Sequence, residues 1–332
     1  MRILIRSTNW IGDAVMTIPA IRKLRSLFPD AKVTLQTRAW AEGIFRDSGL
    51  VDEVIAPGSL FEQIRSLRER RFDLAVIFPN SFGSALAARL SGAKRRFGYA
   101  SERRSFLLTD PIEIPAWKET RHEVYYYLEL ISAIEKSFFG QVSESKDLEP
   151  RLMISETQRA QARDILLQHG INPDSKTVAL APGSTNSRAK RWTPSSFARL
   201  NDRLQSESKL NVVLLGSKDD KEVARTVTDL AVHKPFDMTG ETDIADAAAI
   251  LGVVDLLISN DMGLAHVAPA VGTKTLVIFG PTNPVTTRPF SDKASIISVA
   301  VECAPCMLRD CPIDHRCMTR ISADEVFERA TG

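Results

Sequence analysis

The strongest constraint on the fold is an alternation of short β-rich runs with helical patterns, which occurs twice along the chain. The first series extends from residue 2 to residue 99, and the second from residue 177 to residue 279. Strands that alternate with helices of this length are typical of βαβ units, whose strands form parallel sheets. The sequence therefore predicts an α/β protein with two doubly wound sheets.

In the first series we expect strands at 2–7, 32–37, 51–56, 72–79 and 96–99 and helices at 13–28, 39–47, 60–71 and 82–90. In the second we expect strands at 177–181, 211–215, 255–259 and 275–279 and helices at 156–169, 194–206, 219–231, 244–251 and 262–271. Ser322 and Glu325 have the spacing of a capping box and predict a last helix.

The two series are separated by residues 140–150, GQVSESKDLEP, which are polar and lack periodicity. We interpret this stretch as a linker. It divides the 332 residues into expected domains 1–150 and 151–332, both of ordinary size. Because ligands of doubly wound sheets bind outside the carboxyl ends of the strands, the loops that follow strands are the places to search for a site.

Charge and hydropathy exclude several classes of protein. The chain has 43 Lys and Arg against 41 Asp and Glu, a net charge of +2, and this balance argues against a nucleic-acid coat protein. It has no apolar run of the length that spans a bilayer. The start, MRILIRSTNW, is unlike a secretory signal, so we expect a cytoplasmic protein.

The loop after the first expected strand, STNWIGD, contains a glycine and ends at Asp13. Asp13 is consistent with two roles: an N-cap of the following helix, or a carboxylate that acts as a general base. The loop lacks GxGxxG, so the dinucleotide fingerprint of an oxidoreductase is absent.

Three strand-end loops of the second domain combine small, hydroxyl and charged residues. The first, PGSTNSRAKRW, carries Ser184, Thr185, Lys190 and Arg191 and favours anion binding over a merely solvated loop. It does not have P-loop spacing. The second, SNDMGLAH, opens a helix whose amino end could hold a diphosphate, with Asp261 as a cap or a sugar ligand. The third is GPTNP.

Two further clusters leave alternatives open. Cys303, Cys306, Cys311 and Cys317 lie close together, with His315 between them. They could hold a structural zinc ion or pack as reduced thiols, and we predict no metal. The basic run that includes Lys94, Arg95 and Arg96 is either a solvated face or a surface for an anionic acceptor or lipid headgroups.

These motifs together resemble the lipopolysaccharide heptosyltransferases of glycosyltransferase family 9. The resemblance covers nearly the whole chain and rests on four segments, TNWIGDAVMTIPAIRKLRSLFP, APGSTNSRAKRW, SNDMGLAHVAPAVGTKTLVIFGPTNP and the CAPC…C…HRCM tail. The Trp-Ile-Gly-Asp form of the first loop and the cysteine tail resemble the type II branch most.

The resemblance implies a GT-B fold, in which two Rossmann-like domains face each other across a cleft. Domain 1–150 would bind the acceptor and domain 151–332 would bind ADP-heptose. The family's base matches Asp13, and its phosphate-binding lysine matches Lys190. Its donor-binding loop matches Asp261, Gly263, Leu264 and His266.

The implied reaction is an inverting transfer of L-glycero-D-manno-heptose to the first heptose of the inner core on Kdo-lipid A, without a cofactor. The implied protein is a monomer at the cytoplasmic face of the inner membrane of a Gram-negative cell. The alternatives are another family 9 enzyme, of the type I or type III class, or a nucleotide-sugar binding protein without catalytic activity.

Overall fold

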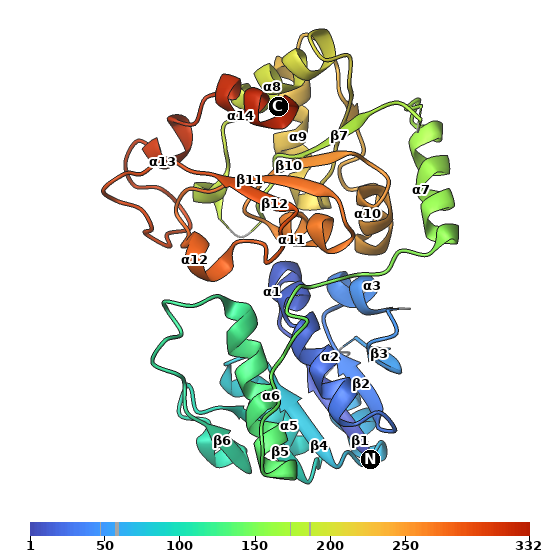
Figure 1. Cartoon of the computed structure of the whole chain (residues 1–332), viewed down its shortest axis with the longest axis vertical. Coiled ribbons are helices and arrows are strands. Elements are labelled where there is room, and N and C mark those ends of the chain that lie inside the picture. Colours follow the sequence, from blue (N-terminus) through green and yellow to red (C-terminus); the bar gives the residue numbers. More distant parts are fainter. Residues whose placement is uncertain (47, 57–59, 173, 186) are drawn as a thin grey trace. The chain divides into compact units, whose positions relative to one another are not determined.

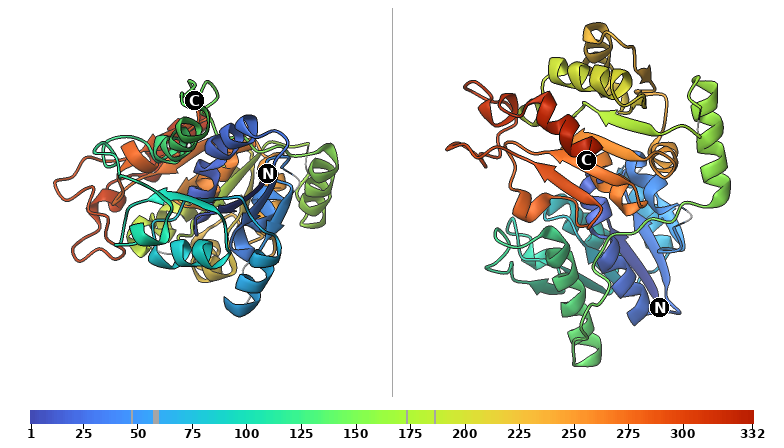
Figure 2. Two further views of the ribbon diagram at one scale, coloured as in Figure 1. Left: turned by 90° about the horizontal axis from the view of Figure 1, so that it is seen from below. Right: turned by 45° about the horizontal axis from the view of Figure 1, so that its top comes forward.

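The structure is a computed structural model that describes residues 1–46, 48–56, 60–172, 174–185 and 187–332. The chain divides into two compact units, Met1–Pro150 and Arg151–Gly332, which we name the N-unit and the C-unit. Each contains one six-stranded sheet of parallel strands with helices packed around it (Figures 1 and 2). The predicted α/β class with two doubly wound sheets is confirmed.

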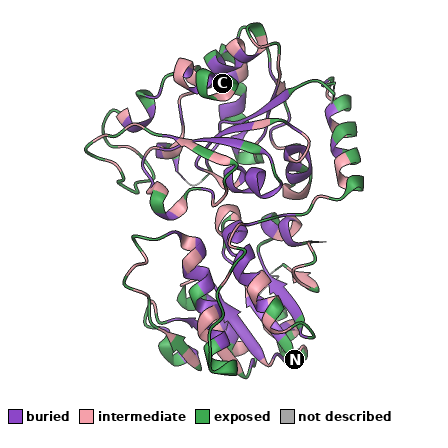
Figure 3. Ribbon diagram, in the orientation of Figure 1, coloured by how far each residue is buried: buried purple, intermediate pink, exposed green. Residues whose placement is uncertain are grey.

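The N-unit sheet has the strand order β3-β2-β1-β4-β5-β6. Its strands are β1 (Arg2–Arg6), β2 (Lys32–Gln36), β3 (Glu53–Ile55), β4 (Leu74–Ile77), β5 (Arg95–Tyr99) and β6 (Asp110–Ile112). Its helices are α1 (Ile11–Met16), α2 (Ile18–Leu27), α3 (Glu42–Phe45), α4 (Leu60–Glu69), α5 (Phe82–Leu90) and α6 (Glu123–Phe139), with short turns η1 (Ala39–Ala41) and η2 (Ser105–Leu107). The central strands are apolar because helices cover both of their faces (Figure 3).

The N-unit differs from the sequence prediction in three places. In place of the helix expected over 39–47, the structure has the short turn η1 followed by the four-residue helix α3, and residue 47 lies outside the described residues. The single helix expected over 13–28 is divided at Thr17, where Pro19 occupies the first turn of α2 and the Thr17 hydroxyl donates to the Ala14 carbonyl oxygen at 2.7 Å. Strand β6 and the 17-residue helix α6 were not predicted.

The C-unit sheet has the strand order β12-β11-β10-β7-β8-β9. Its strands are β7 (Thr177–Ala181), β8 (Asn211–Leu214), β9 (Phe236–Asp237), β10 (Leu256–Asn260), β11 (Lys274–Ile278) and β12 (Ala294–Ile297). Its helices are α7 (Glu156–Gln168), α8 (Pro194–Ser206), α9 (Lys221–Leu230), α10 (Ile244–Leu251), α11 (Gly263–Ala270), α12 (Pro284–Thr287), α13 (Arg316–Thr319) and α14 (Ala323–Thr331), with short turns η3 (Arg188–Lys190) and η4 (Lys218–Asp220).

Trp192 anchors the core of the C-unit. Its indole is fully buried, packs edge-on against Phe197 at 5.0 Å between ring centroids, and donates from Nε1 to the Ile321 carbonyl oxygen at 2.9 Å. Ser322 then caps α14 by accepting from the Glu325 amide at 3.1 Å, so the predicted start of this helix is confirmed. Helices α8 and α14 are thereby fixed to the end of the loop that follows β7.

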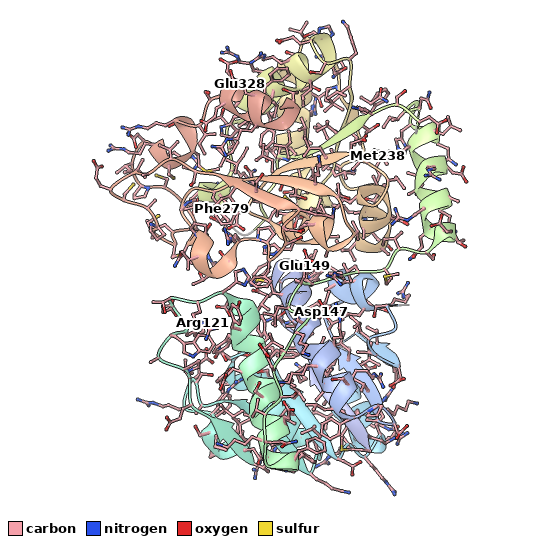
Figure 4. All side chains as sticks on the ribbon, in the orientation of Figure 1. Arg121, Asp147, Glu149, Met238, Phe279 and Glu328 are labelled. Carbon is pink, nitrogen blue, oxygen red and sulfur yellow. The ribbon has the colours of Figure 1, made fainter. Side chains whose placement is uncertain are left out.

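The stretch expected to be a linker contains no helix or strand from residue 141 to residue 150. Its beginning is attached to the N-unit, because Lys23 donates to the Ser143 carbonyl oxygen at 3.1 Å and Arg22 pairs with Asp147 (Figure 4). Its far end leads to Leu152, whose amide donates to the Ala270 carbonyl oxygen in the C-unit at 2.8 Å.

In the part of the chain that the structure describes, every helix is too short or too polar to cross a bilayer.

Candidate functional site

The chain order of the C-unit sheet reverses at β7, which lies between β8 and β10. Loops that diverge at such a point leave room for a ligand at the carboxyl edge of the sheet. Asn260, the last residue of β10, fixes the loop that follows β7. Its amide donates to the carbonyl oxygens of Pro182 at 2.8 Å and Gly183 at 3.1 Å, and its Oδ1 accepts from the Trp192 amide at 2.9 Å.

Three of these strand-end loops meet at one carboxylate oxygen. Lys190 Nζ, from the loop after β7, lies 2.7 Å from Asp261 Oδ2, after β10. The Thr282 hydroxyl, after β11, donates to the same oxygen at 2.7 Å. The Asp261 side chain is 5% exposed and that of Lys190 is 28% exposed. The ammonium group is thus held at the carboxyl edge of the sheet with part of its surface open to a ligand.

The amino end of α11 lies directly after Asp261. Met262 is the N-cap residue, its backbone is extended, and among the described residues no side chain caps the helix. The alternative that Asp261 is the cap is therefore wrong, because its carboxylate binds Lys190 and Thr282 instead. The first backbone amides of α11 are those of Gly263 and Leu264. They lie at the amino end of the helix, where the helix dipole stabilises an anion. His266 is buried in the same helix.

The loop after β7 is shaped by close packing. A Cβ at Gly183 would lie 2.1 Å from Asp220 Oδ1, so only glycine fits this approach. Arg191 donates from Nε and Nη2 to the Ser184 carbonyl oxygen at 3.3 and 3.2 Å. Its guanidinium group is therefore bound to the backbone of its own loop. Ser184 is buried and Thr185 is exposed. Of the two predicted cations, Lys190 is the one that the structure brings together with Asp261.

The cysteine tail packs against this same loop. The Ala189 amide donates to the Arg309 carbonyl oxygen at 2.9 Å, and the imidazole Nε2 of His315 hydrogen-bonds the Ala189 carbonyl oxygen. Cys317 is buried in the core, where burial, with the three other cysteines adding to it, raises the pKa of its thiol. All four thiols are free, and no cluster in the described residues has the geometry of a metal site. The tail thus holds the loop that carries Lys190 through these two hydrogen bonds.

In the N-unit, Asp13 lies on the third residue of α1, in its first turn, and Trp10 is the N-cap residue. The interpretation of Asp13 as an N-cap is therefore wrong. Tyr127 of α6 hydrogen-bonds the Asp13 side chain. Burial, and then the charge of Asp13, raise the pKa of Tyr127 well above its usual value, so the phenol stays protonated and donates to the carboxylate. Phe78 packs edge-on against the Tyr127 ring at 5.5 Å.

Lys94, Arg95 and Arg96 occupy the amino end of β5, whereas the loop that leads to Asp13 follows the carboxyl end of the parallel strand β1. Each is engaged locally. Lys94 pairs with Asp73 at 2.8 Å, Arg95 pairs with Asp110, and Arg96 donates to carbonyl oxygens in its own neighbourhood. The structure does not bring these cations to Asp13, and we do not retain them as acceptor-binding residues.

The basic run that begins at Lys94 extends to Arg104. Arg104 is fully buried, so the interpretation of the run as a solvated face does not hold for this residue. Its guanidinium donates to the carbonyl oxygens of Tyr99, Pro79 and Ser81 and fixes the loop after β4. Tyr127 was not among the predicted site residues, since its partner Asp13 is distant in the chain. Asn260 lies in the predicted SNDMGLAH loop, but its contacts with the loop after β7 were not predicted. Thr282 lies in the predicted GPTNP loop, which follows β11, and the structure brings it to Asp261.

Comparison with known proteins shows the family of the chain. Residues 60–316 match the family model of glycosyltransferase family 9 (heptosyltransferase). Lipopolysaccharide heptosyltransferase 2 of Escherichia coli K12 is 29% identical, and that of Salmonella typhimurium LT2 is 30% identical, in each case over 90% of this chain and 88% of the relative.

Solved structures extend the likeness to the fold. The structure of E. coli ADP-heptose LPS heptosyltransferase II has a TM-score of 0.85 and 26% identity, and covers 99% of this chain and 97% of that one. A family 9 glycosyltransferase from Veillonella parvula has a TM-score of 0.84 at 22% identity and covers 99% and 96% of the two chains, which shows the same fold. The chain therefore belongs to glycosyltransferase family 9 and is a glycosyltransferase of the heptosyltransferase family.

Proposed function

We propose that the protein is an ADP-heptose:lipopolysaccharide heptosyltransferase of type II. It transfers L-glycero-D-manno-heptose from ADP-heptose to the first heptose of the inner core on Kdo-lipid A. The observation that carries the proposal is the similarity, along nine-tenths of the chain, to relatives that are named heptosyltransferase 2. The loops at the carboxyl edge of the C-unit sheet supply the kind of site that a diphosphate donor requires.

In this proposal the C-unit binds ADP-heptose. The diphosphate rests on the amides of Gly263 and Leu264 at the amino end of α11, and Lys190 neutralises part of its charge. Ser184 and Thr185 add hydrogen-bond donors from the loop after β7, and Asp261 and His266 flank the heptose. The ion pair with Asp261 holds Lys190 in place before the donor arrives, which lowers the entropy cost of binding.

The N-unit binds the acceptor, and Asp13 is the general base. Its carboxylate takes the proton of the acceptor hydroxyl as that oxygen attacks the anomeric carbon of the heptose. The bond between this carbon and the β-phosphate oxygen breaks, so the configuration inverts and ADP leaves. Lys190 and the α11 amides stabilise the negative charge that develops on the leaving diphosphate. Tyr127 orients the base through its hydrogen bond to Asp13.

The acceptor is anchored in a lipid bilayer, so the enzyme has to work where that substrate is exposed. We therefore place the protein in the cytoplasm, as a monomer in peripheral contact with the inner membrane. The proposal includes no cofactor, no metal and no nucleic-acid partner.

The test is a transfer assay read by mass spectrometry. The protein is incubated with ADP-heptose and heptosyl-Kdo-lipid A, and the expected product has gained one heptose. Kdo-lipid A without heptose is the matched control and should not react. Transfer to that control in place of the heptosylated acceptor would instead indicate the type I reaction. Binding of ADP-heptose without transfer to any core acceptor would indicate a nucleotide-sugar binding protein.

A further inference from the structure

Buried polar atoms without partners gather where β1 and β2 end in the N-unit. They are the Nε of Arg6, the hydroxyls of Ser7, Thr8 and Thr37, and the side-chain nitrogen of Gln36. Arg6 and Gln36 are opposite each other in the parallel register, and the other three residues directly follow them. Buried hydrogen-bonding groups are nearly always paired in proteins, so a cluster of unpaired ones indicates a ligand.

The charge of this cluster is positive and is not neutralised by the described part of the chain. The one hydrogen-bond partner of Arg6 there is the Gln36 side-chain oxygen. Arg38, which is exposed, donates to Asn9 Oδ1 at 3.2 Å and lies over the Trp40 ring at 5.7 Å. Burial, and then the neighbouring charge of Arg38, lower the pKa of Arg6 to about 10, so the guanidinium is still charged at neutral pH.

Other arginines of the N-unit behave differently. Several half-buried ones bind carboxylates, as in the pairs Arg22–Asp147, Arg25–Asp52, Arg70–Glu53 and Arg95–Asp110. The fully buried Arg104 donates instead to the backbone carbonyl oxygens of Tyr99, Pro79 and Ser81. The half-buried guanidinium of Arg6 has neither a carboxylate nor such a set of carbonyl oxygens, and this arrangement is costly to the fold. Arg6 lies at the carboxyl edge of the sheet, where proteins of this fold class bind ligands, so a bound anion would offset the cost of its unpaired charge.

The donor set defines the chemistry of the ligand. Guanidinium groups, hydroxyls and an amide nitrogen all donate hydrogen bonds, which anion oxygens accept, and guanidinium binds phosphate and carboxylate in a bidentate manner. The cluster also begins the loop that leads into α1 and to Asp13. An anion bound there would fix a substrate close to the base.

We propose that Arg6 and Arg38, with the hydroxyls of Ser7, Thr8 and Thr37, form a binding site for an oxyanion of the acceptor, either a phosphate or a carboxylate group. The inference that this oxyanion belongs to the acceptor rests on the proposed function. The binding of an oxyanion does not.

The first experiment measures binding without reference to activity. Thermal unfolding is followed in sodium chloride, with inorganic phosphate or acetate replacing chloride at constant ionic strength. We expect phosphate, acetate or both to raise the Tm of the wild-type protein and to raise that of Arg6→Met less. Anions bound in the C-unit contribute equally to both proteins and cancel. The larger of the two shifts identifies the preferred kind of anion.

The Tm without added anion separates a ligand site from a structural role. Arg6→Met removes an unneutralised buried charge and keeps most of the volume, so its Tm in chloride should equal or exceed that of the wild type. Arg38→Gln and Thr37→Val should also reduce the anion-dependent shift, and they keep the proposal testable if Arg6→Met does not fold. Arg89→Gln, an exposed arginine at the end of α5, is the charge-matched control and should behave as wild type.

The second experiment is steady-state kinetics. For Arg6→Met and Arg38→Gln we expect the KM for the acceptor to rise about tenfold or more, and the KM for ADP-heptose to change less than about twofold. If the anion-dependent shift is the same in Arg6→Met as in the wild type, the proposal is overturned, and a lower Tm in chloride then makes Arg6 structural. If the shift depends on Arg6 but no acceptor reacts, the site stands and the proposed function fails.

Discussion

At the scale of single residues, the proposed chemistry depends on one carboxylate. Asp13→Asn keeps the shape of the side chain but cannot accept a proton at neutral pH. We expect kcat to fall by about 10²–10⁴-fold, the range that general-base assistance supplies. The affinity for ADP, measured by calorimetry, should be unchanged because the substitution lies in the N-unit. Turnover within a few-fold of the wild type would remove Asp13 from the mechanism.

The phenol of Tyr127 should affect the pH at which Asp13 works. A donated hydrogen bond stabilises the ionised form of a carboxylate, and its loss in Tyr127→Phe makes that form less favourable. We expect the acid limb of the kcat/KM–pH profile to move to higher pH, with little change in Tm. Tyr99→Phe is a matched control, because it removes a buried phenol that donates to the Tyr126 carbonyl oxygen at 2.7 Å. Equal profiles for the two variants would contradict a positioning role.

The ion pair between Lys190 and Asp261 should contribute to both stability and donor binding. Lys190→Met leaves the buried Asp261 carboxylate without its cation, a loss of roughly 1–3 kcal/mol of unfolding free energy. It should also weaken ADP binding. Asp261→Asn in the same chain should restore part of the stability but none of the ADP affinity. A double-mutant cycle on the two readouts checks this, and additive stability effects would show that the pair is not coupled.

At the scale of elements, the amino end of α11 is proposed to bind the diphosphate through backbone amides. Gly263→Pro removes one of these amides at a helix position that tolerates proline, and the extended backbone of Met262 suits a residue before proline. We expect ADP to bind about tenfold more weakly, with an unchanged Tm. Gly263→Ala keeps the amide and should bind ADP as the wild type does. If both variants lose the same affinity, the added side-chain volume is the cause.

The sequence predicted the elements that obey simple periodicity. Thr177–Ala181, Pro194–Ser206 and Ile244–Leu251 have the expected bounds because their apolar residues follow one period and their ends carry turn or capping residues. Helix α6 was missed because it is rich in tyrosine, isoleucine and phenylalanine and is apolar around much of its surface. Tertiary packing, and not helix propensity, makes this segment a helix.

The candidate site was likewise predictable where it depends on strand ends and unpredictable where it depends on tertiary packing. The loops were predictable because strands of a parallel sheet end at one edge, which brings Lys190 and Asp261 together. Tyr127 beside Asp13 was not predictable, because its role depends on where α6 packs. The unpaired Arg6 was likewise hidden, since a sequence cannot show which of many arginines lacks a carboxylate. Lys94, Arg95 and Arg96 looked like a binding surface because Asp73 and Asp110, which pair with two of them, are not next to them in the sequence.

At the scale of the whole molecule, the near-zero net charge conceals an uneven distribution of ion pairs. In the N-unit, hydrogen bonds from Arg70 and Lys94 are the main cause of the lowered pKa values of Glu53 and Asp73. Burial opposes the lowering for Asp52, Asp110 and Glu135, but their hydrogen bonds and neighbouring cations outweigh it. In the C-unit, the carboxylates with lowered pKa values, Glu207 and Asp314, lie at the surface and pair with Arg203 and Arg316.

This difference predicts that acid weakens the N-unit first. A carboxylate whose pKa is lower in the folded state adds stability above its unfolded-state pKa, near 4, and that stability is lost as the pH falls. His169 in the C-unit has a raised pKa because it hydrogen-bonds Glu241. A raised pKa makes the stability depend on pH in the opposite direction. Its stabilisation is kept at low pH and lost as the pH rises through its folded-state pKa.

Pulsed hydrogen exchange with mass spectrometry between pH 6 and pH 3 can follow the two units separately. Peptides from β1, β4 and α2 report on the N-unit, and peptides from β7, β10 and α8 report on the C-unit. We expect the N-unit segments to lose protection at the higher pH. Glu53→Gln together with Asp73→Asn removes two of the titrating groups, so this variant should be less stable than the wild type at pH 7 and lose less stability on acidification. Simultaneous loss of protection in both units, with no effect of the double substitution, would mean that the N-unit ion pairs do not control the acid stability of the chain.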